Sequence, residues 1–462
     1  MSLISFWFVF FLPVVTGVNF ILPKRYRYIW LFVASVFFYL ANDVRFATGM
    51  AICVVTTYVT GLFLGKANPC MRKALLTFCI LVNILMLFLF RYSSLHSVLV
   101  PIGISFYTLQ AISYVIDVYR NQIEPECNPV KYGLYVSFFP TVISGPIQRG
   151  TGLLQQIKEG RDFSYDRAHA GLYDLLKGYL LKLVLANQLG GMVDYAYANC
   201  DNMPGATLLW ATILYAVQLY FDFAGYSALA IGTAKILGFE LEENFQQPYF
   251  ACSVKDFWRR WHISLSSWLK DYVYIPLGGN RKGMCRKCCN LLITFLISGL
   301  WHGTGIQFLI WGALHGVYQI AGSLVPGKKE AERKGIRRVF SVALTFLLVD
   351  FAWLFFRAES PMQAVTILHR ICCEFRLKEM TFYGSYLLGG TKLQLLFTLI
   401  GILFVFLVDV MHERKIFIED IAKRKIPTVV RWGVYIILTV LILFAAVHDY
   451  GQVASTFIYE RF

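Results

Sequence analysis

One histidine stands in a segment where its chemistry would be unusual. His302 lies in the run SGLWHG (298–303), inside a long apolar stretch. If that stretch crosses a membrane, an ionisable side chain within it is costly and marks a functional site by default. Imidazole changes its charge near neutral pH and suits proton abstraction. We therefore predict that His302 is a general base that activates a hydroxyl group toward an acyl donor.

Other kinds of reactive centre find little support in the sequence. It contains no Ser–His–Asp spacing, no nucleophile elbow, no glycine-rich phosphate loop and no metal-ligand histidine pair. Cys285, Cys288 and Cys289 are close together, but no second ligand pair follows at zinc spacing, so we predict no metal site. His315 stays open between a core histidine bonded to a backbone carbonyl and a second functional group.

A second chemical feature is the basic segment from Lys255 to Lys287, which carries eight Lys or Arg against two Asp. Its first part, residues 253–271, repeats apolar side chains at three and four positions and begins with capping-box spacing from Ser253 to Asp256. We expect one amphipathic helix in the membrane interface. Two interpretations stay open: a helix resting on anionic lipid, or a docking site for a phosphorylated or acidic acyl donor in the cytoplasm.

The composition defines the class of protein that must position these residues. Of 462 residues, 57% are hydrophobic and only 15% are charged, and the mean hydropathy is +0.56. These values exclude a disordered, collagen-like or nucleic-acid-coating chain and disfavour a soluble enzyme. We predict an all-α polytopic membrane protein with no nucleic-acid partner. The net charge of +15 is then explained mainly by basic cytoplasmic loops, and partly by an anionic partner.

The distribution of basic residues predicts the topology. An uncleaved first span at 2–22, with its N-terminus outside, precedes further spans near 28–41, 46–65, 74–90 and 97–116. The basic loops 24–27 and 66–73 then fall on the cytoplasmic side. We expect about 11 to 13 helices that cross or dip into the membrane. They form a single domain over residues 1–462.

The stretch that carries His302 has basic residues at both ends, Lys287 and Lys328, and is long enough for two helical passes. It should therefore enter the membrane and return. His302 lies 15 residues past Lys287, which is roughly 22 Å along a helix and places it at mid-membrane depth. Asp222 is another deep polar group. It could orient an imidazole or pair with an arginine, and we favour a structural role for it.

Several motifs resemble one known family. They are FWRRWHISLS (257–266), WLKDYVYIPLGG (268–279), SGLWHG (298–303), PIGISFY (101–107), IDVYR (116–120), SGPIQR (144–149) and FDFAGYS (221–227). The chain resembles the membrane-bound O-acyltransferases, or MBOAT family, and within it the bacterial alginate O-acetylation branch. The proteins that transfer D-alanine to teichoic acid are related. The resemblance is densest at 99–318.

The resemblance implies a ring of tilted helices around a thin centre with a tunnel. It implies that His302 is the essential histidine and His262 the second recurrent one, so both are our catalytic candidates. We expect the substrate-binding side chains to be Trp258, Arg259, Arg260, Trp261, Asp222, Trp301, Arg281 and Lys282. Bulky residues at Gly299 or Gly303 should close the passage beside His302.

The expected function is transfer of an acyl group, most simply acetyl, from a cytoplasmic thioester across a bacterial inner (plasma) membrane to an exported or cell-wall polysaccharide. No cofactor is expected to bind tightly, and the donor is acetyl-CoA or an acyl-carrier thioester. The resemblance also implies an extracytoplasmic acyltransferase partner. D-alanyl or other short-acyl transfer from a carrier protein is the alternative. A transporter or flippase is the different class, but it predicts repeated halves, which the sequence does not show.

Overall fold

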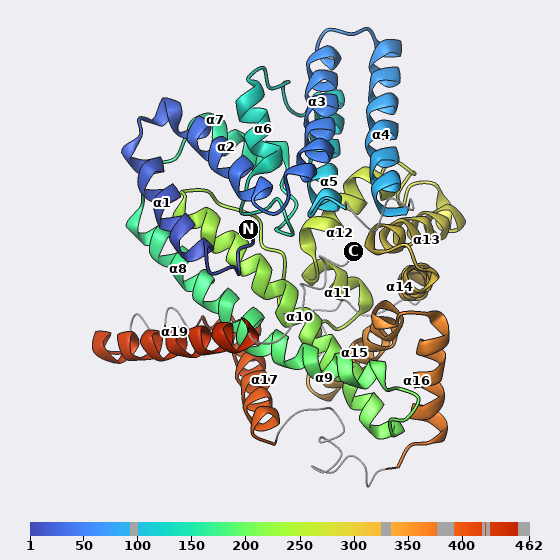
Figure 1. Cartoon of the computed structure of the whole chain (residues 1–462). Coiled ribbons are helices and arrows are strands. Elements are labelled where there is room, and N and C mark those ends of the chain that lie inside the picture. Colours follow the sequence, from blue (N-terminus) through green and yellow to red (C-terminus); the bar gives the residue numbers. More distant parts are fainter. Residues whose placement is uncertain (93–99, 325–333, 377–391, 418–420, 422–425, 451–462) are drawn as a thin grey trace. The chain divides into compact units, whose positions relative to one another are not determined.

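The computed structural model describes residues 1–92, 100–324, 334–376, 392–417, 421 and 426–450 (Figure 1). The described residues fold into helices, and their only β-type pairing is one isolated bridge between Phe245 and Trp261. The prediction of an all-α polytopic membrane protein is therefore confirmed. Seven helices within this part of the chain are long and apolar enough to cross a membrane: Val44–Leu64, Pro69–Arg91, Gly205–Ile236, Gly283–His302, Ile336–Arg357, Gln394–Glu413 and Thr428–Ala446.

Other apolar helices, α1 and α14 among them, are not counted in these seven spans. The first helix, α1 (Phe8–Ile21), has 14 residues and contains Pro13, and α14 (Ile306–Leu324) has 19. The prediction of 11 to 13 crossing or dipping helices therefore stays a prediction. The apolar stretches of the long helices lie largely on the surface of the protein. Only 17% of that stretch is buried in α4, and only 6% in α17. Lipid is the solvent that such surfaces require.

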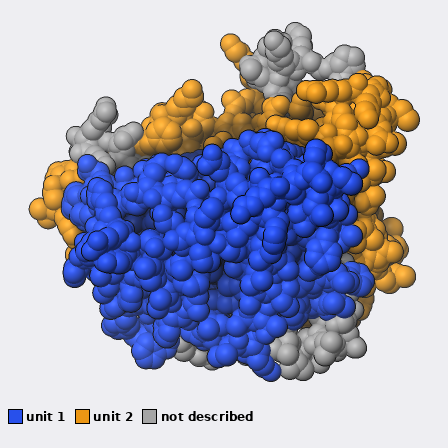
Figure 2. Space-filling view, turned by 90° about the horizontal axis from the view of Figure 1, so that it is seen from above, with its two compact units in different colours: residues 1–178, 226–243 blue, residues 179–225, 244–462 orange. Residues whose placement is uncertain are grey.

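The chain divides into two compact units, residues 1–178 with 226–243 and residues 179–225 with 244–462 (Figure 2). The first unit contains α1, α2 (Lys24–Leu40), η1 (Val44–Phe46), α3 (Ala47–Leu64), α4 (Pro69–Tyr92), α5 (Ile104–Tyr119), α6 (Pro129–Ser137), η3 (Gly150–Leu154), α7 (Gln155–Glu159), α8 (Tyr165–Tyr179) and the C-terminal part of α10 (Gly205–Ile236). The predicted single domain over 1–462 stays a prediction.

The second unit contains the N-terminal part of α10 and both conspicuous histidine motifs. Its other elements are η4 (Leu180–Ala186), α9 (Asn187–Ala198), η5 (Pro248–Phe250), α11 (Val254–Arg260), α12 (Ile263–Leu269), η6 (Lys270–Tyr274), α13 (Gly283–His302), α14, α15 (Ile336–Arg357), α16 (Pro361–Cys373), α17 (Lys392–Glu413) and α19 (Thr428–Tyr450).

In the first unit, small residues let helices approach closely. Figure 1 shows α3 and α4 as an antiparallel pair, and α3 also packs on α5. A Cβ placed on Gly61 of α3 would lie 2.8 Å from the Tyr114 ring of α5, so only glycine fits there. The Tyr132 hydroxyl of α6 donates to the Thr57 hydroxyl of α3 at 2.7 Å. This bond satisfies two buried polar groups inside the helix bundle.

In the second unit, α13 and α14 form the predicted in-and-back hairpin, joined by residues 303–305. Glycines bring the two backbones into contact. A Cβ on Gly299 would lie 2.3 Å from the Phe308 carbonyl oxygen, and one on Gly312 would lie 2.4 Å from that of Phe295. A Cβ on Gly303 would meet the Phe308 ring at 2.1 Å. Tryptophan at Gly299 or Gly303 would therefore force the hairpin apart. That such variants block transfer stays a prediction, but they would also disturb the packing of the hairpin.

The predicted continuous amphipathic helix over 253–271 is also wrong. The segment breaks at Trp261 and His262 into α11, α12 and the π-helical turn η6. Its apolar residues face protein, since Phe257, Trp261 and Leu265 are at most 1% exposed. Periodicity showed which side chains need an apolar environment, but it could not distinguish lipid from a protein core. The predicted cap is confirmed, because the Ser253 hydroxyl accepts from the Asp256 N–H at 3.0 Å.

Candidate functional site

His302 ends α13 and points into an aromatic shell. It is 2% exposed, and its ring centroid lies 4.7 Å from that of Trp301, 5.0 Å from Trp311 and 5.2 Å from Phe356. These rings come from the two helices of the hairpin and from α15. Uncharged walls of this kind keep bulk water from an imidazole and strengthen its electrostatic interactions.

His262 occupies the break between α11 and α12. Its φ of +45° lies in the left-handed region, where a residue other than glycine carries strain of about 1–3 kcal/mol. Backbone hydrogen bonds to residues 244–246, which precede η5, interrupt the helix at His262. The Gln246 N–H donates to the Arg260 carbonyl at 2.9 Å, and the Ile263 N–H donates to the Asn244 carbonyl at 3.0 Å. Strained positions of this kind cluster at functional sites, which agrees with the prediction of a role for His262.

The Asn244 side chain determines which nitrogen of His262 carries the proton. Its Oδ1 accepts from the Ser264 N–H at 3.2 Å and from the Ser264 hydroxyl at 2.9 Å, and it lies 3.1 Å from His262 Nδ1. Because a backbone N–H can only donate, this amide atom is the oxygen, and His262 Nδ1 must donate to it. The lone pair of the neutral ring is then on Nε2. His262 lies outside the seven candidate spans, and burial lowers its pKa to about 3.

Trp301 connects the two histidines. Its ring centroid lies 6.0 Å from that of His262 and 4.7 Å from that of His302. Phe223 of α10 contacts His262 edge-on at 4.6 Å. Two histidine motifs 40 residues apart therefore converge on one indole. The structure thus brings together His262, His302 and Trp301 of the predicted site residues.

Trp258 and Trp261 are packed into the core beside this group. They are 8% and 1% exposed. The Trp258 indole N–H donates to His315 Nδ1 at 3.2 Å, so the lone pair of His315 faces that indole. His315 is fully buried and follows the core-histidine interpretation, with an indole as its partner where a backbone carbonyl was expected. Contact of Trp258 or Trp261 with substrate stays a prediction.

The four predicted basic residues differ in their surroundings. Arg260 forms ion pairs with Asp256 at 3.2 Å and with Glu413. Glu413 also pairs with Arg338 at 2.7 Å. Arg259, Arg281 and Lys282 are exposed. Sequence reasoning missed Glu413, because it lies 153 residues from Arg260.

Asp222 pairs with the lysine Lys182, where the sequence had suggested an arginine or an imidazole. The two side chains are 3% and 2% exposed. Lys182 belongs to the π-helical segment LLKLVLA (180–186). A lysine inside such an apolar run was the signal in the sequence that should have indicated a buried carboxylate partner. The ion pair favours the structural role expected for Asp222.

Comparison with known proteins agrees with these features. Residues 84–325 match the model of MBOAT, the membrane-bound O-acyltransferase family. The chain is 38% identical over 371 residues to "Probable alginate O-acetylase AlgI" of Pseudomonas aeruginosa, covering 76% of this chain and 70% of that protein. It is 34% identical over 386 residues to the peptidoglycan O-acetyltransferase of Helicobacter pylori, covering 74% and 72%.

A more distant relative is the teichoic acid D-alanyltransferase of Bacillus subtilis, with 29% identity over 235 residues, 48% of this chain and 58% of that protein. The matched region contains both histidine motifs and the hairpin that carries His302. The helical architecture, the apolar spans and these matches lead to one conclusion: the chain is a multi-pass membrane enzyme that belongs to the membrane-bound O-acyltransferase family.

Proposed function

We propose that this protein passes an acetyl group from a cytoplasmic thioester across a bacterial cell membrane, for O-acetylation of an exported or cell-wall polysaccharide, with His302 as general base. The carrying observation is the convergence of His302 and His262 on Trp301. The relatives named for O-acetylation of alginate and of peptidoglycan support acetyl as the group and a polysaccharide as the final acceptor.

In the proposed reaction, an acceptor hydroxyl oxygen attacks the thioester carbonyl carbon. A C–O bond forms, the C–S bond breaks, and the sulfur leaves as thiolate. His302 takes the hydroxyl proton and returns it to the thiolate, so that an ester and a thiol result. The rings of Trp311 and Phe356 exclude water, which would otherwise hydrolyse the thioester. His262, with its tautomer set by Asn244, orients the donor or acceptor through Nε2.

The depth of His302 supports delivery from the cytoplasmic side. Arg286 and Lys287 lie in the first turns of α13 and are strongly hydrated, so they stay near the membrane surface. His302 follows about 22 Å farther along the helix, within a hydrocarbon core about 30 Å thick. A hydrophilic polymer cannot enter from lipid. The proposal therefore includes a passage from both faces to His302 and an extracytoplasmic acyltransferase partner that completes transfer.

The test uses the full-length protein in proteoliposomes, with radiolabelled acetyl-CoA on the cytoplasmic side and the extracytoplasmic acyltransferase partner with its polysaccharide on the other side. We expect His302→Gln to lower turnover by about 10²–10⁴-fold, the usual contribution of a general base, with an unchanged melting temperature. His169→Gln is the matched control, because His169 lies in α8 of the first unit and stacks on Tyr165. Full turnover in folded His302→Gln would contradict the proposal.

D-alanyl transfer from a carrier protein is the second candidate, supported by the teichoic acid D-alanyltransferase match. The two candidates differ in the donor that binds the basic segment from Lys255 to Lys287. The same proteoliposomes are given either acetyl-CoA or a D-alanyl carrier-protein thioester at equal concentration. If only the carrier-protein thioester labels the product, the transferred group is D-alanyl and acetyl transfer is contradicted. If only acetyl-CoA labels it, O-acetylation is supported.

A further inference from the structure

The first unit contains a pocket with a cavity volume of about 350 Å³, and six of its sixteen lining residues are cations. This volume is within the range of small-molecule sites. Its charged lining consists of Lys24, Arg25, Arg27, Lys131, Lys158, Arg161 and Glu159. Leu31, Leu134, Leu237 and Phe239, all at most 4% exposed, form apolar walls. We call this cavity the basic pocket. The reaction proposed above uses none of these residues.

Carboxylates neutralise only part of this charge. Lys24 pairs with Asp162 at 2.5 Å, Lys158 with Glu126 at 3.1 Å and Arg161 with Glu159 at 3.3 Å. Hydrogen bonding from Lys24 holds the pKa of Asp162 below its usual value, so this carboxylate is ionised at neutral pH.

Six cations nevertheless face three carboxylates. Arg25 and Lys131 contact only the rings of Tyr26 and Tyr28 and have no carboxylate partner among the described residues. The pocket therefore retains positive charge that an anionic ligand would neutralise.

A buried amide in the wall points to a ligand independently of the charge. Asn19 lies in the apolar helix α1, is 2% exposed and lines the basic pocket. Its Oδ1 has no hydrogen-bond partner in the described part of the chain, and neither has the buried Arg161 Nε. Buried polar groups in native proteins are almost always hydrogen-bonded, so each orphan atom requires an explanation. An amide offers both donors and an acceptor. It therefore suits a phosphate ester that also carries a hydroxyl.

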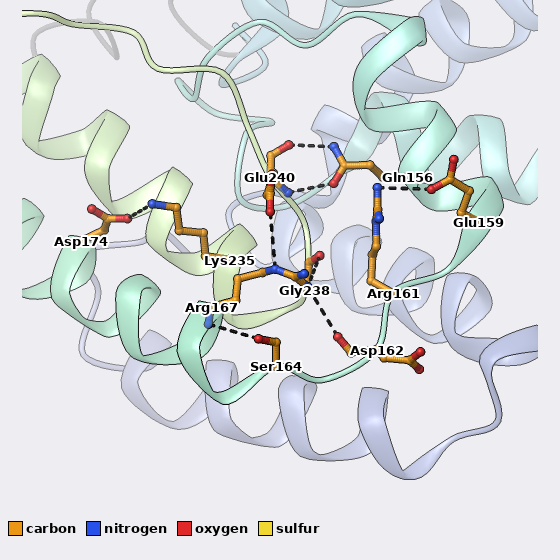
Figure 3. Close-up of polar contacts among 10 residues, drawn as sticks. All are labelled: Gln156, Glu159, Arg161, Asp162, Ser164, Arg167, Asp174, Lys235, Gly238 and Glu240. Carbon is orange, nitrogen blue, oxygen red and sulfur yellow. Dashed lines mark hydrogen bonds and ion pairs between the residues drawn. The ribbon is translucent and has the colours of Figure 1, made fainter.

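Polar contacts fix the segment that carries Arg161 (Figure 3). The Gln156 amide and the Glu240 backbone exchange two hydrogen bonds of 2.8 Å. The Arg167 guanidinium donates to the Gly238 carbonyl at 3.1 Å. Arg27 donates from the opposite wall to the Arg161 carbonyl at 2.6 Å. The walls are therefore preorganised, which reduces the entropic cost of holding a ligand.

The geometry points to the basic pocket as a binding site for the phosphate-bearing headgroup of an anionic glycerophospholipid. Basic pockets between membrane helices on the cytoplasmic side are suited to such headgroups. Residues 24–27, which form the first turn of α2, are predicted to lie on that side. Ile21 and Phe163, which lie close in sequence to the lining residues Lys24 and Arg161, are 84% and 56% exposed. They offer an apolar surface for the acyl chains. A soluble phosphate compound shares the headgroup chemistry but would gain nothing from that surface.

The test measures lipid retained by the purified full-length protein in native mass spectrometry. The probes are dioleoylphosphatidylglycerol and dioleoylphosphatidylcholine, and calorimetry with inorganic phosphate is the second arm. The pocket variant is Arg25→Gln with Lys131→Gln. Its matched control is Lys66→Gln with Lys73→Gln, which removes the same charge from exposed residues around the α3–α4 loop. Asn19→Leu removes the amide and leaves the charge unchanged.

We expect one phosphatidylglycerol per chain and little phosphatidylcholine. The pocket variant should lose at least about tenfold, as for hydrogen bonds to a charged group. Asn19→Leu should lose about two- to tenfold, as for a neutral hydrogen bond to a headgroup hydroxyl. The control should retain wild-type occupancy. Equal losses in the pocket variant and its control would overturn the site. Phosphate binding that needs the pocket residues, combined with no preference for phosphatidylglycerol, would overturn the lipid as its ligand.

Discussion

Aromatic rings surround His302 in the second unit, whereas cations line the basic pocket of the first unit. His302 contacts Trp301, Trp311 and Phe356 and is almost fully buried. The pocket presents six cations around a cavity of about 350 Å³. A site that holds a reactive thioester gains from walls that exclude water, because water would hydrolyse it. A ligand with a permanent charge needs fixed opposite charges. The different surroundings fit the two proposals, His302 as general base and the basic pocket as a site for an anionic headgroup.

The core of the second unit also contains charges, namely the Lys182–Asp222 ion pair. Substituting its members tests whether pairing is what stabilises them there. Both side chains are buried. We expect Lys182→Met to lower the free energy of unfolding by about 3–5 kcal/mol, because the buried Asp222 would lose the cation with which it pairs. The double variant Lys182→Met with Asp222→Leu should recover most of this loss. The measurement is thermal unfolding in detergent, and a double variant no more stable than the single one would show that pairing is not the reason.

The next prediction concerns Asn244, whose side chain bonds to His262. Asn244→Ala removes the acceptor for His262 Nδ1 and for both donors of Ser264. We expect about a 10–100-fold loss of kcat, since losing such an acceptor costs about 1–3 kcal/mol. Asn244→Asp keeps the acceptor but adds a negative charge, so it should raise the pKa of His262 and shift the acid limb of the pH–rate profile upward. A uniform loss in both variants without any shift would indicate structural damage alone.

The helices could be predicted from the sequence, but the side-chain partners across the fold could not. The apolar runs predicted the helices α3 and α4 closely, and the basic ends of the hairpin predicted its return. The resemblance to the family predicted His302 and His262 as catalytic residues, and their roles stay predictions. The motif spacing could not predict Asn244 or Glu413 as partners, since hydrogen bonds and ion pairs across the fold leave no periodic trace. The break at His262 was missed because the apolar spacing continues through it, while backbone pairing with 244–246 interrupts the helix.

Acidification should distinguish the fully buried His262 from the half-buried His169. Its pKa is about 3 in the folded protein and about 6.5 when unfolded. The unfolded state therefore binds the extra proton first, and stability is lost as pH falls from 6.5 toward 3, by at most about 1.4 kcal/mol per pH unit. His262→Asn tolerates the left-handed backbone and should lose less stability between pH 7.5 and 5.0. His169→Asn is the control and should behave as wild type.

The smallest effect is expected at the exposed cations of the second unit. Arg281 and Lys282 are exposed, so their attraction for an anionic donor is screened beyond about 8 Å at physiological salt. Exposed charge interactions are worth about 0.2–1 kcal/mol. The variant Arg281→Gln with Lys282→Gln should therefore raise KM for the donor by only about two- to fivefold, with kcat unchanged. The increase should be larger at low salt and vanish at high salt.

Arg260 sharpens this prediction because it is not equivalent to the other cations. Its guanidinium is held by Asp256 and Glu413, and Glu413 also holds Arg338. Removing it leaves a carboxylate cluster without one of its cations, so Arg260→Gln should lower the melting temperature at every salt concentration. Measuring KM and melting temperature at 50 and 500 mM salt for both variants separates the two cases. A salt-dependent KM effect in Arg260→Gln with unchanged stability would place Arg260 among the donor-attracting residues instead.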